Sequence, residues 1–137
     1  MSFIDMAMDD VREKGMAPEA RYDLVVVSAK VGDTKAGDRK KLSVVIDILG
    51  GEFEPIFETF VFPNKKDKEE NEGRNNELFI LSIKRFLYLF GIPWEASGWN
   101  LDTLSGATAE NILVSCQKGD DGVERNKITY PRLPEGS

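Results

Sequence analysis

Apolar and polar residues alternate along three consecutive stretches near the start of the chain, residues 21–31, 40–51 and 52–63. Alternation with a period of two is typical of a β-strand that buries one face. The clearest buried face belongs to the second stretch and consists of Leu42, Val44, Ile46 and Ile48. The charged turn GDTKAGDR follows the first stretch, and the pair Gly50 and Gly51 permits a sharp turn after the second. We therefore expect three successive strands.

The third of these stretches has bulky apolar side chains on both of its faces. Phe57 lies on one face, whereas Phe60 and Phe62 share the other face with Glu58. If Glu58 faces water, Phe60 and Phe62 are exposed beside it. With the opposite parity, Phe57 is the exposed aromatic residue. A third alternative is that the N-terminal segment or the charged segment downstream covers these phenylalanines. The pattern leaves the three alternatives open.

One long helix is predicted over residues 77–90. Its apolar face has helical spacing and consists of Phe79, Ile80, Ile83, Phe86, Leu87 and Phe90. Gly91 and Pro93 end the pattern. The segment before the helix, residues 63–76, is PNKKDKEENEGRNN, with four acidic and four basic residues and no apolar anchor. Such a composition predicts a solvated, mobile loop.

Trp94 and Trp99 lie in the connection after the helix, and each is expected to pack beneath the helix rather than to stack on a base. Cys116 falls on the inner face of a predicted fourth strand, residues 111–117, where we expect a small buried side chain. The hairpin turn KGDDG leads into a fifth strand over residues 123–130. The order β-β-β-α-β-β is the connectivity of the OB-fold, a small five-stranded Greek-key barrel with one helix between strands three and four.

The pattern indicates one OB-fold-like domain over residues 21–134, followed by a short tail at residues 135–137. Residues 1–20 form a leader, in which a short amphipathic helix is predicted over residues 2–12. We expect this leader to pack on the barrel or to fray, and the alternative is a helix that binds a partner. No apolar run reaches the roughly 18 residues of a membrane span. A single cysteine without a signal-peptide pattern favours a cytoplasmic protein.

Charge and composition narrow the functional classes. The chain has 18 basic and 24 acidic residues, a net charge of −6, which does not favour a nonspecific binder of duplex DNA. A local basic groove is compatible with that balance. The sequence has no histidine, which removes the commonest general base and the commonest metal ligand. It also lacks the phosphate-cradling, dinucleotide-binding and nucleophile-elbow motifs. We therefore expect no catalytic activity, no metal and no cofactor.

Residues 21–134 contain four short motifs, each present once. They are a TK.G turn, a second strand ending in G-x-[FY], the pattern L..L.G after the helix, and NK(I/V)..Y in the last strand. The residues that carry them are Thr34, Lys35, Gly37, Gly51, Phe53, Leu101, Leu104, Gly106, Asn126, Lys127, Ile128 and Tyr130. With these motifs the chain resembles the bacteriophage OB-fold single-stranded-DNA-binding proteins.

The resemblance implies single-stranded DNA as the partner, a role in phage DNA replication or recombination, and a location in the host cytoplasm. The chain departs from that family in two places. Glu54 and Pro55 stand where many relatives keep a small residue and a basic one, and the tail PRLPEGS lacks a long acidic ending.

A single strand of DNA offers phosphates to cations and unpaired bases to aromatic faces. The candidate cations on the predicted barrel are Lys35, Arg39, Lys41, Lys118, Arg125 and Lys127. The candidate stacking residues are Phe57, Phe60 and Phe62. No set of side chains suggests the reading of base edges, so we expect binding without sequence preference. RNA in place of DNA, and self-association of the chain, stay open.

The main alternative function is a protein-interaction module. The same barrel, with its net negative charge and exposed phenylalanines, then binds a replication or recombination protein or mimics DNA against a host factor. A third alternative is an enzyme that acts on nucleic acid, for which the scattered acidic residues give little support.

Overall fold

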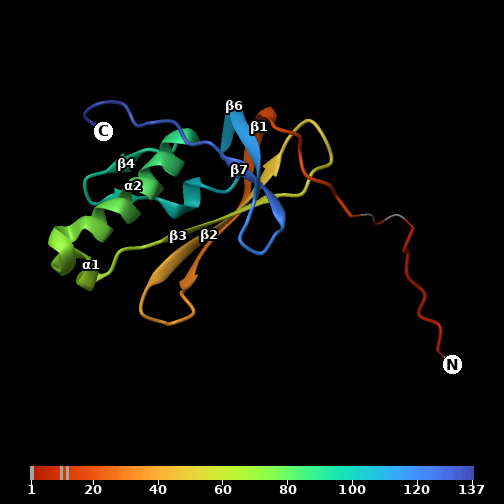
Figure 1. The fold of residues 1–137 in the computed structure, drawn as a ribbon, viewed down its shortest axis with the longest axis horizontal. Helices are drawn as coiled ribbons and strands as arrows, with labels where there is room; N and C mark the ends of the chain where they lie inside the picture. Colours follow the sequence, from red (N-terminus) through yellow and green to blue (C-terminus); the bar gives the residue numbers. More distant parts are fainter. Residues whose placement is uncertain (1, 10, 12) are drawn as a thin grey trace.

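The computed structural model describes residues 2–9, 11 and 13–137. Its main sheet has five antiparallel strands in the spatial order β3-β2-β1-β6-β7 (Figure 1). These strands are β1 (Ala20–Asp33), β2 (Lys40–Ile48), β3 (Ile56–Val61), β6 (Thr108–Lys118) and β7 (Glu124–Ile128). Between β3 and β6 the chain forms α1 (Lys65–Glu69), α2 (Arg74–Leu89) and a small hairpin of β4 (Trp94–Glu95) and β5 (Gly98–Trp99). The mainly β architecture with a helix between the third and fourth strands of the sheet is confirmed, whereas the small hairpin was not predicted.

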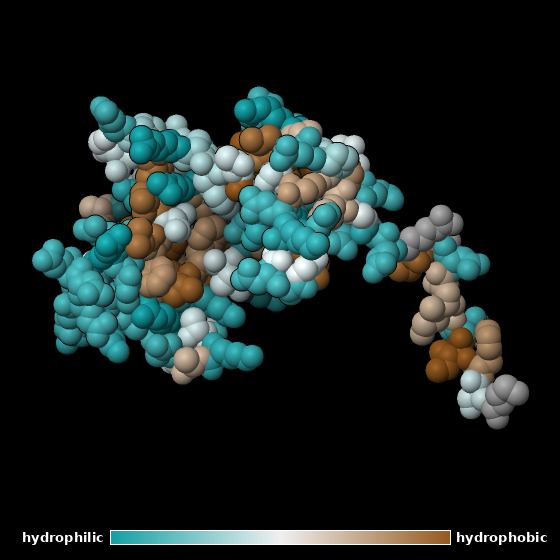
Figure 2. All heavy atoms as spheres, viewed as in Figure 1, coloured by the Kyte–Doolittle hydropathy of each residue, from teal (hydrophilic) through white to brown (hydrophobic). Residues whose placement is uncertain are grey.

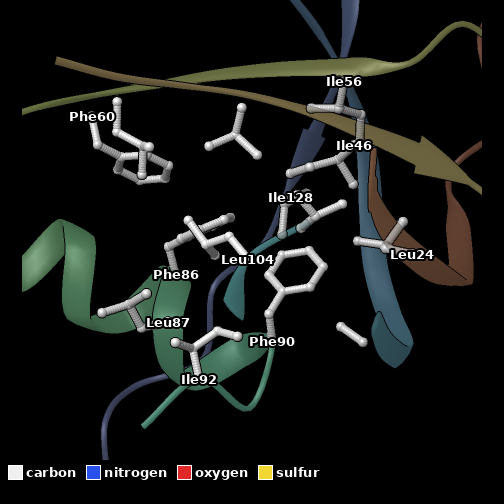
Figure 3. Packing of buried hydrophobic residues seen from close by; sticks show 14 of the residues in the cluster. Leu24, Ile46, Ile56, Phe60, Phe86, Leu87, Phe90, Ile92, Leu104 and Ile128 are labelled. Atoms are coloured by element: carbon white, nitrogen blue, oxygen red, sulfur yellow. The ribbon is translucent and has the colours of Figure 1, made fainter. Parts of the chain in front are cut away.

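The core lies between the sheet and α2. The buried face predicted for β2 is confirmed, since Leu42, Val44, Ile46 and Ile48 are all buried. Figure 3 shows Phe86 and Phe90 pointing from the helix side toward Ile46 and Ile128 of the sheet. The ring centroids of Phe86 and Phe60 lie 4.8 Å apart, so β3 and α2 meet through aromatic packing. Burial of these apolar side chains is the main favourable term in folding.

The sheet curls, but strand pairing does not close it. Its two edge strands, β3 and β7, contact each other, although no strand pairing joins them in the described part of the chain. A flat sheet of five strands would hold its edges roughly 19 Å apart, given a spacing of about 4.8 Å between neighbouring strands. Contact between the edges therefore requires a strongly curved sheet.

A bulge in β1 changes which of its residues face outward. Before the bulge, Val26 lies opposite Ile46 on the core face. After the bulge, Ser28 lies opposite Val45 on the outer face. Lys30 follows on the outer face with an exposed side chain. The second half of β1 therefore has the reverse parity of the first half.

The prediction of a mobile loop over residues 63–76 is wrong, because α1 and the start of α2 lie within this segment. Asn64 caps α1 and forms a capping box with Asp67: each side chain accepts a hydrogen bond from the other residue's backbone N–H. Asp67 is buried, so the charged segment is anchored by an acid rather than by an apolar side chain. Asn71, Glu72 and Gly73 then adopt positive φ angles, and this left-handed kink leads into α2.

The predicted long helix is confirmed as α2, which begins three residues earlier than residue 77. It ends where Gly91 adopts a positive φ of 69°, a conformation that favours glycine. No helix in the described part of the chain combines the length and the apolar character needed to cross a bilayer.

The N-terminal segment has no helix among its described residues, so the predicted amphipathic helix is wrong there; Asp10 and Arg12 lie outside those residues. The segment is an arm that projects away from the sheet (Figure 1). At its root, Gly15 forms a parallel bridge with Phe53, and Ala17 exchanges backbone hydrogen bonds with the Asn126 side chain. Few tertiary contacts beyond this root are available to stabilise a single amphipathic turn.

Cys116 has an exposed side chain, so the prediction that it is buried is wrong. It lies on β6 opposite Asn126 of β7, and the amide of Asn126 occupies the inner position at this end of the sheet. The Cys116 thiol donates instead to the carbonyl oxygen of Ala17, 3.2 Å away. The neighbours of Cys116 at the root of the arm are therefore polar groups, the Asn126 amide and the Ala17 backbone, rather than apolar core side chains.

Candidate nucleic-acid interface

The pairing of β3 with β2 decides which phenylalanine faces outward. Phe57 lies opposite Val45 on the outer face and is 71% exposed. Phe60 lies opposite Leu42 on the core face and is 7% exposed. Glu58, opposite Val44, shares the core-facing side of β3. Of the two predicted orientations of β3, the structure has the one that exposes Phe57. The prediction that Phe60 is a stacking residue is wrong, because its side chain is buried.

Phe62, the third stacking candidate, lies just beyond β3. It is half-buried and packs against the core. It lines a groove together with Trp94 and Trp99, on the α2 side of the molecule. Phe62 is therefore separated from Phe57 and does not extend the same aromatic surface.

A groove of about 280 Å³ runs between the start of β3 and the β6–β7 hairpin. Phe57 lines it from β3, and Arg125 and Lys127 line it from β7. The curl of the sheet is what brings these residues together, since β3 and β7 are at opposite ends of the strand order. Three of the nine predicted site residues thus share one groove, which also contains the carboxylates of Glu54 and Glu124.

The two cations of this groove differ in their partners. The Arg125 guanidinium forms an ion pair with Asp121, with 2.7 Å between Nη2 and Oδ2. This contact, together with a hydrogen bond from the Val123 backbone, lowers the pKa of the Asp121 carboxyl to about 2. Lys127 is exposed and forms no ion pair among the described residues. Lys127 is therefore the cation of the groove that is most accessible to a phosphate.

Lys118, the last residue of β6, extends the basic surface of this hairpin. It is exposed and lies opposite Glu124 of β7. A β-carbon placed on Gly122 would lie 4.0 Å from the Lys118 side chain, so that side chain folds over the turn. Lys118 thus lies beside the groove rather than in it.

The other three predicted cations are in or near the β1–β2 loop. Lys35 is exposed in the turn itself, and Lys41 is half-buried on the outer face of β2 opposite Val61. Arg39 is directed elsewhere: its guanidinium pairs with the Asp67 carboxylate and lies 5.3 Å from the centroid of the Phe79 ring. The loop therefore provides Lys35 as an accessible cation, the half-buried Lys41 follows on β2, and Arg39 serves to hold α1.

Lys30 is a candidate that sequence reasoning missed. On the outer face it lies opposite Ser43 of β2, and Ser43 in turn lies opposite Thr59 of β3. Parity counted from Leu24 and Val26 places Lys30 on the inner face. Only the bulge turns it outward, and no residue pattern in the sequence marks that bulge. Lys30 places a cation on the outer face between the groove and the β1–β2 loop.

A second cleft, of about 410 Å³, lies behind β3 and contains Glu58, Arg85 and Tyr130. Burial raises the pKa of the Glu58 carboxyl above its usual value, and the charge of Lys127 opposes that effect. Burial, and then the charge of Glu58, raises the pKa of the Tyr130 phenol. The Tyr130 hydroxyl is buried and has no hydrogen-bond partner among the described residues. These groups lie on the core-facing side of β3, so a nucleic acid bound on the outer face of the sheet would not contact them.

No family model matches the chain, and no curated protein matches its sequence. In the part of the chain that the structure describes, no three Cys, Asp or Glu side chains lie close enough together to hold a metal ion. The resemblance to the phage proteins therefore stays a prediction.

Proposed function

We propose that the protein binds single-stranded DNA without sequence preference, in phage DNA replication or recombination in the host cytoplasm. The observation that supports this most is the groove in which Phe57 lies beside Arg125 and Lys127. An exposed aromatic ring stacks on any base, and neighbouring cations neutralise the phosphates on either side of it. RNA offers the same two groups and is an outcome of the binding test.

The strand order supports an opened OB-like barrel. In the OB-fold, the second and third strands and the loops that follow the first and fourth strands bind oligonucleotides. The corresponding parts here are β2, β3, the β1–β2 loop and the β6–β7 loop, and every predicted cation lies in or beside them. Contact between β3 and β7 brings together the two edges that closure of such a barrel would join.

In this proposal the single-stranded DNA follows the outer face of the sheet. One base stacks on Phe57 in the groove, and the DNA backbone then passes Lys30 toward Lys41 on β2 and Lys35 in the β1–β2 loop. The hydroxyls of Ser43 and Thr59 lie along this path and offer hydrogen-bond donors to phosphate or sugar. A single OB-like domain with such a path covers about 4–16 nucleotides.

The test is binding of a fluorescently labelled oligo-dT, followed by anisotropy at increasing salt. We expect affinity at low salt that falls steeply as salt is added, because phosphate contacts release counterions. Phe57→Ala should weaken binding by about 1–3 kcal/mol without lowering Tm, since the side chain is exposed. Tyr88→Ala is the matched control, an exposed aromatic residue on α2 outside the groove. Equal losses for the two variants, or affinity that does not change with salt, would contradict the proposal.

A protein-interaction module is the second candidate, and the carboxylates favour it. Glu54 and Glu124 line the groove beside Phe57, and Arg125 is already paired with Asp121. A groove with this mixture of charges also suits a peptide that carries both signs. Absence of binding to oligo-dT and oligo-U at low salt would favour this candidate over the first.

A further inference from the structure

The described part of the N-terminal arm carries large apolar side chains that contact nothing in the fold. Within residues 2–9 the exposed fractions are 93% for Phe3, 73% for Ile4, 62% for Met6 and 68% for Met8. Figure 2 shows these apolar atoms on a segment that stands off the body of the protein. Scattered apolar residues are normal on a surface, whereas four within eight residues form a concentrated apolar segment of the kind associated with interaction sites.

A groove of about 520 Å³ lies between α2 and the β4–β5 hairpin. Its walls are mostly apolar and include Phe62, Ile80, Ile83, Leu87, Trp94 and Trp99. The Lys84 ammonium lies 5.4 Å from the centroid of the Trp94 ring and gives the groove a positive charge, while Glu95 adds a negative one. In Figure 2 apolar atoms also gather on the α2 side of the body.

We propose that residues 2–9 of one copy of the chain bind in this groove on a second copy. The segment is SFIDMAMD, with two acidic residues and no basic one, so it complements Lys84. In an extended backbone, Ile4, Met6 and Met8 point to one side and enter the groove together. Methionine adapts its shape to irregular apolar surfaces, including tryptophan rings.

The arm leaves the fold on the side away from the groove of the same copy (Figure 1). Its root is fixed by the bridge between Gly15 and Phe53 and by the hydrogen bonds between Ala17 and Asn126. In Figure 1 the arm leaves from this root on the side opposite to α2 and β4. About twelve extended residues span roughly 40 Å, enough to reach the groove of a neighbour. Since arm and groove are different surfaces, two copies can exchange arms, or several can join in series.

The two tryptophans of the chain, Trp94 and Trp99, both line this groove, so intrinsic fluorescence reports its occupancy. With the full chain and no DNA, we expect the emission maximum to shift to shorter wavelength as protein concentration rises. Sedimentation velocity should show a larger species over the same concentration range. A variant with Phe3→Ser, Ile4→Ser and Met6→Ser should lose both changes. A synthetic peptide of residues 2–14 added to that variant should restore the emission shift.

Variants in the groove test the other half of the contact. Ile80→Ser, a partly exposed position on the wall, should weaken peptide binding, and Lys84→Glu should weaken it by about threefold. Leu78→Ser is the matched control, an exposed apolar residue of α2 outside the groove, and should leave peptide binding unchanged.

Three results would overturn the proposal. The first is a monomer at every concentration, with the same emission for the natural chain and the arm variant. The second is an emission difference between these two proteins in a monomer, which would place the arm in its own groove. The third is self-association that persists in the arm variant. Because the experiment contains no nucleic acid, its outcome is independent of DNA binding.

Discussion

The guanidinium of Arg39, in the β1–β2 loop, forms a two-point ion pair with the carboxylate of Asp67, 28 residues later in α1. Asp67 also accepts a hydrogen bond from the Asn64 backbone, so one buried carboxylate joins the loop to the cap of the helix. An arginine whose position suggests a phosphate contact therefore holds two segments of the protein together. We therefore expect Arg39 to contribute less to DNA binding than Lys35, four residues away in the same loop.

Arg39→Ala should lower Tm by several degrees and leave oligo-dT affinity of the folded protein nearly unchanged. Arg39→Lys should also lower Tm, because a lysine cannot form the two parallel hydrogen bonds of the guanidinium. A phosphate contact would tolerate lysine, so this variant separates the two roles. Tm by circular dichroism and affinity by anisotropy are the measurements. An Arg39→Ala protein with the natural Tm and weak DNA binding would contradict the assignment.

The stabilisation of the fold by the ion pair between Arg39 and Asp67 should depend on pH. The hydrogen bonds from Arg39 lower the pKa of the Asp67 carboxyl in the folded protein. An acid with a lowered folded pKa stabilises the fold above its unfolded pKa of about 3.9 and loses that stabilisation as pH falls through the folded value. The difference in Tm between the natural chain and Asp67→Asn should therefore be full at pH 6 and shrink in strong acid.

Lys30 and Lys127 should each contribute a phosphate contact to DNA binding. Each alanine variant should reduce the slope of log affinity against log salt by about 1, and affinity should fall equally for oligonucleotides of different sequence. Both side chains are exposed, so Lys30→Ala should leave Tm unchanged, and Lys127→Ala should lower Tm only slightly, through the loss of its charge near Glu58. Lys14→Ala is a suitable control, an exposed lysine at the root of the arm that lines neither the groove nor the outer face. If Lys30→Ala leaves the slope of log affinity against log salt unchanged, the bound DNA does not follow the outer face of the sheet past Lys30.

Asp121→Asn should strengthen DNA binding. Asp121 now occupies the Arg125 guanidinium and adds a negative charge next to the groove. Its replacement frees Arg125 and removes that repulsion, so we expect tighter binding at low salt and a smaller gain at high salt. Asp102→Asn, which removes an exposed carboxylate elsewhere, serves as the control for net charge. Equal gains for the two variants would show that only total charge matters.

The strands and α2 follow from local patterns, and these were predictable. The alternation over Leu42 to Ile48 and the apolar stripe from Ile83 to Phe90 each depend on residues close in sequence. The exposure of Phe57 depends on the register between β3 and β2, which places it opposite Val45. A pattern with apolar groups on both faces does not determine that register.

The remaining differences depend on contacts between distant residues. The charged segment is held as α1 by the ion pair between Asp67 and Arg39, which is distant in the sequence. Composition alone does not reveal such a partner. Lys30 faces outward because a bulge reverses the parity of β1 after Val26. Two of the six predicted cations, Arg39 and Arg125, are paired with acids. Counting basic residues in a sequence therefore overstates how many remain accessible to a phosphate.

Glu58→Gln should stabilise the protein at neutral pH. Glu58 lies on the core-facing side of β3, and burial raises the pKa of its carboxyl above the usual 4.5. The unfolded chain therefore loses this proton at a lower pH than the folded protein does. Stability contributed by the protonated acid is complete below pH 4.5 and is lost as pH rises through the folded value.

A glutamine has no charge to bury, so Glu58→Gln should raise Tm at pH 7, and the gain should shrink as pH approaches 4. Lys127 partly offsets the buried charge, so Lys127→Ala in the natural chain should lower Tm slightly at pH 7, and should not do so once Glu58 is glutamine. Glu110→Gln, at an exposed position of β6, is the control. Thermal melts from pH 4 to pH 8 measure both effects. A gain that is the same at every pH would show that packing, rather than the buried charge, accounts for it.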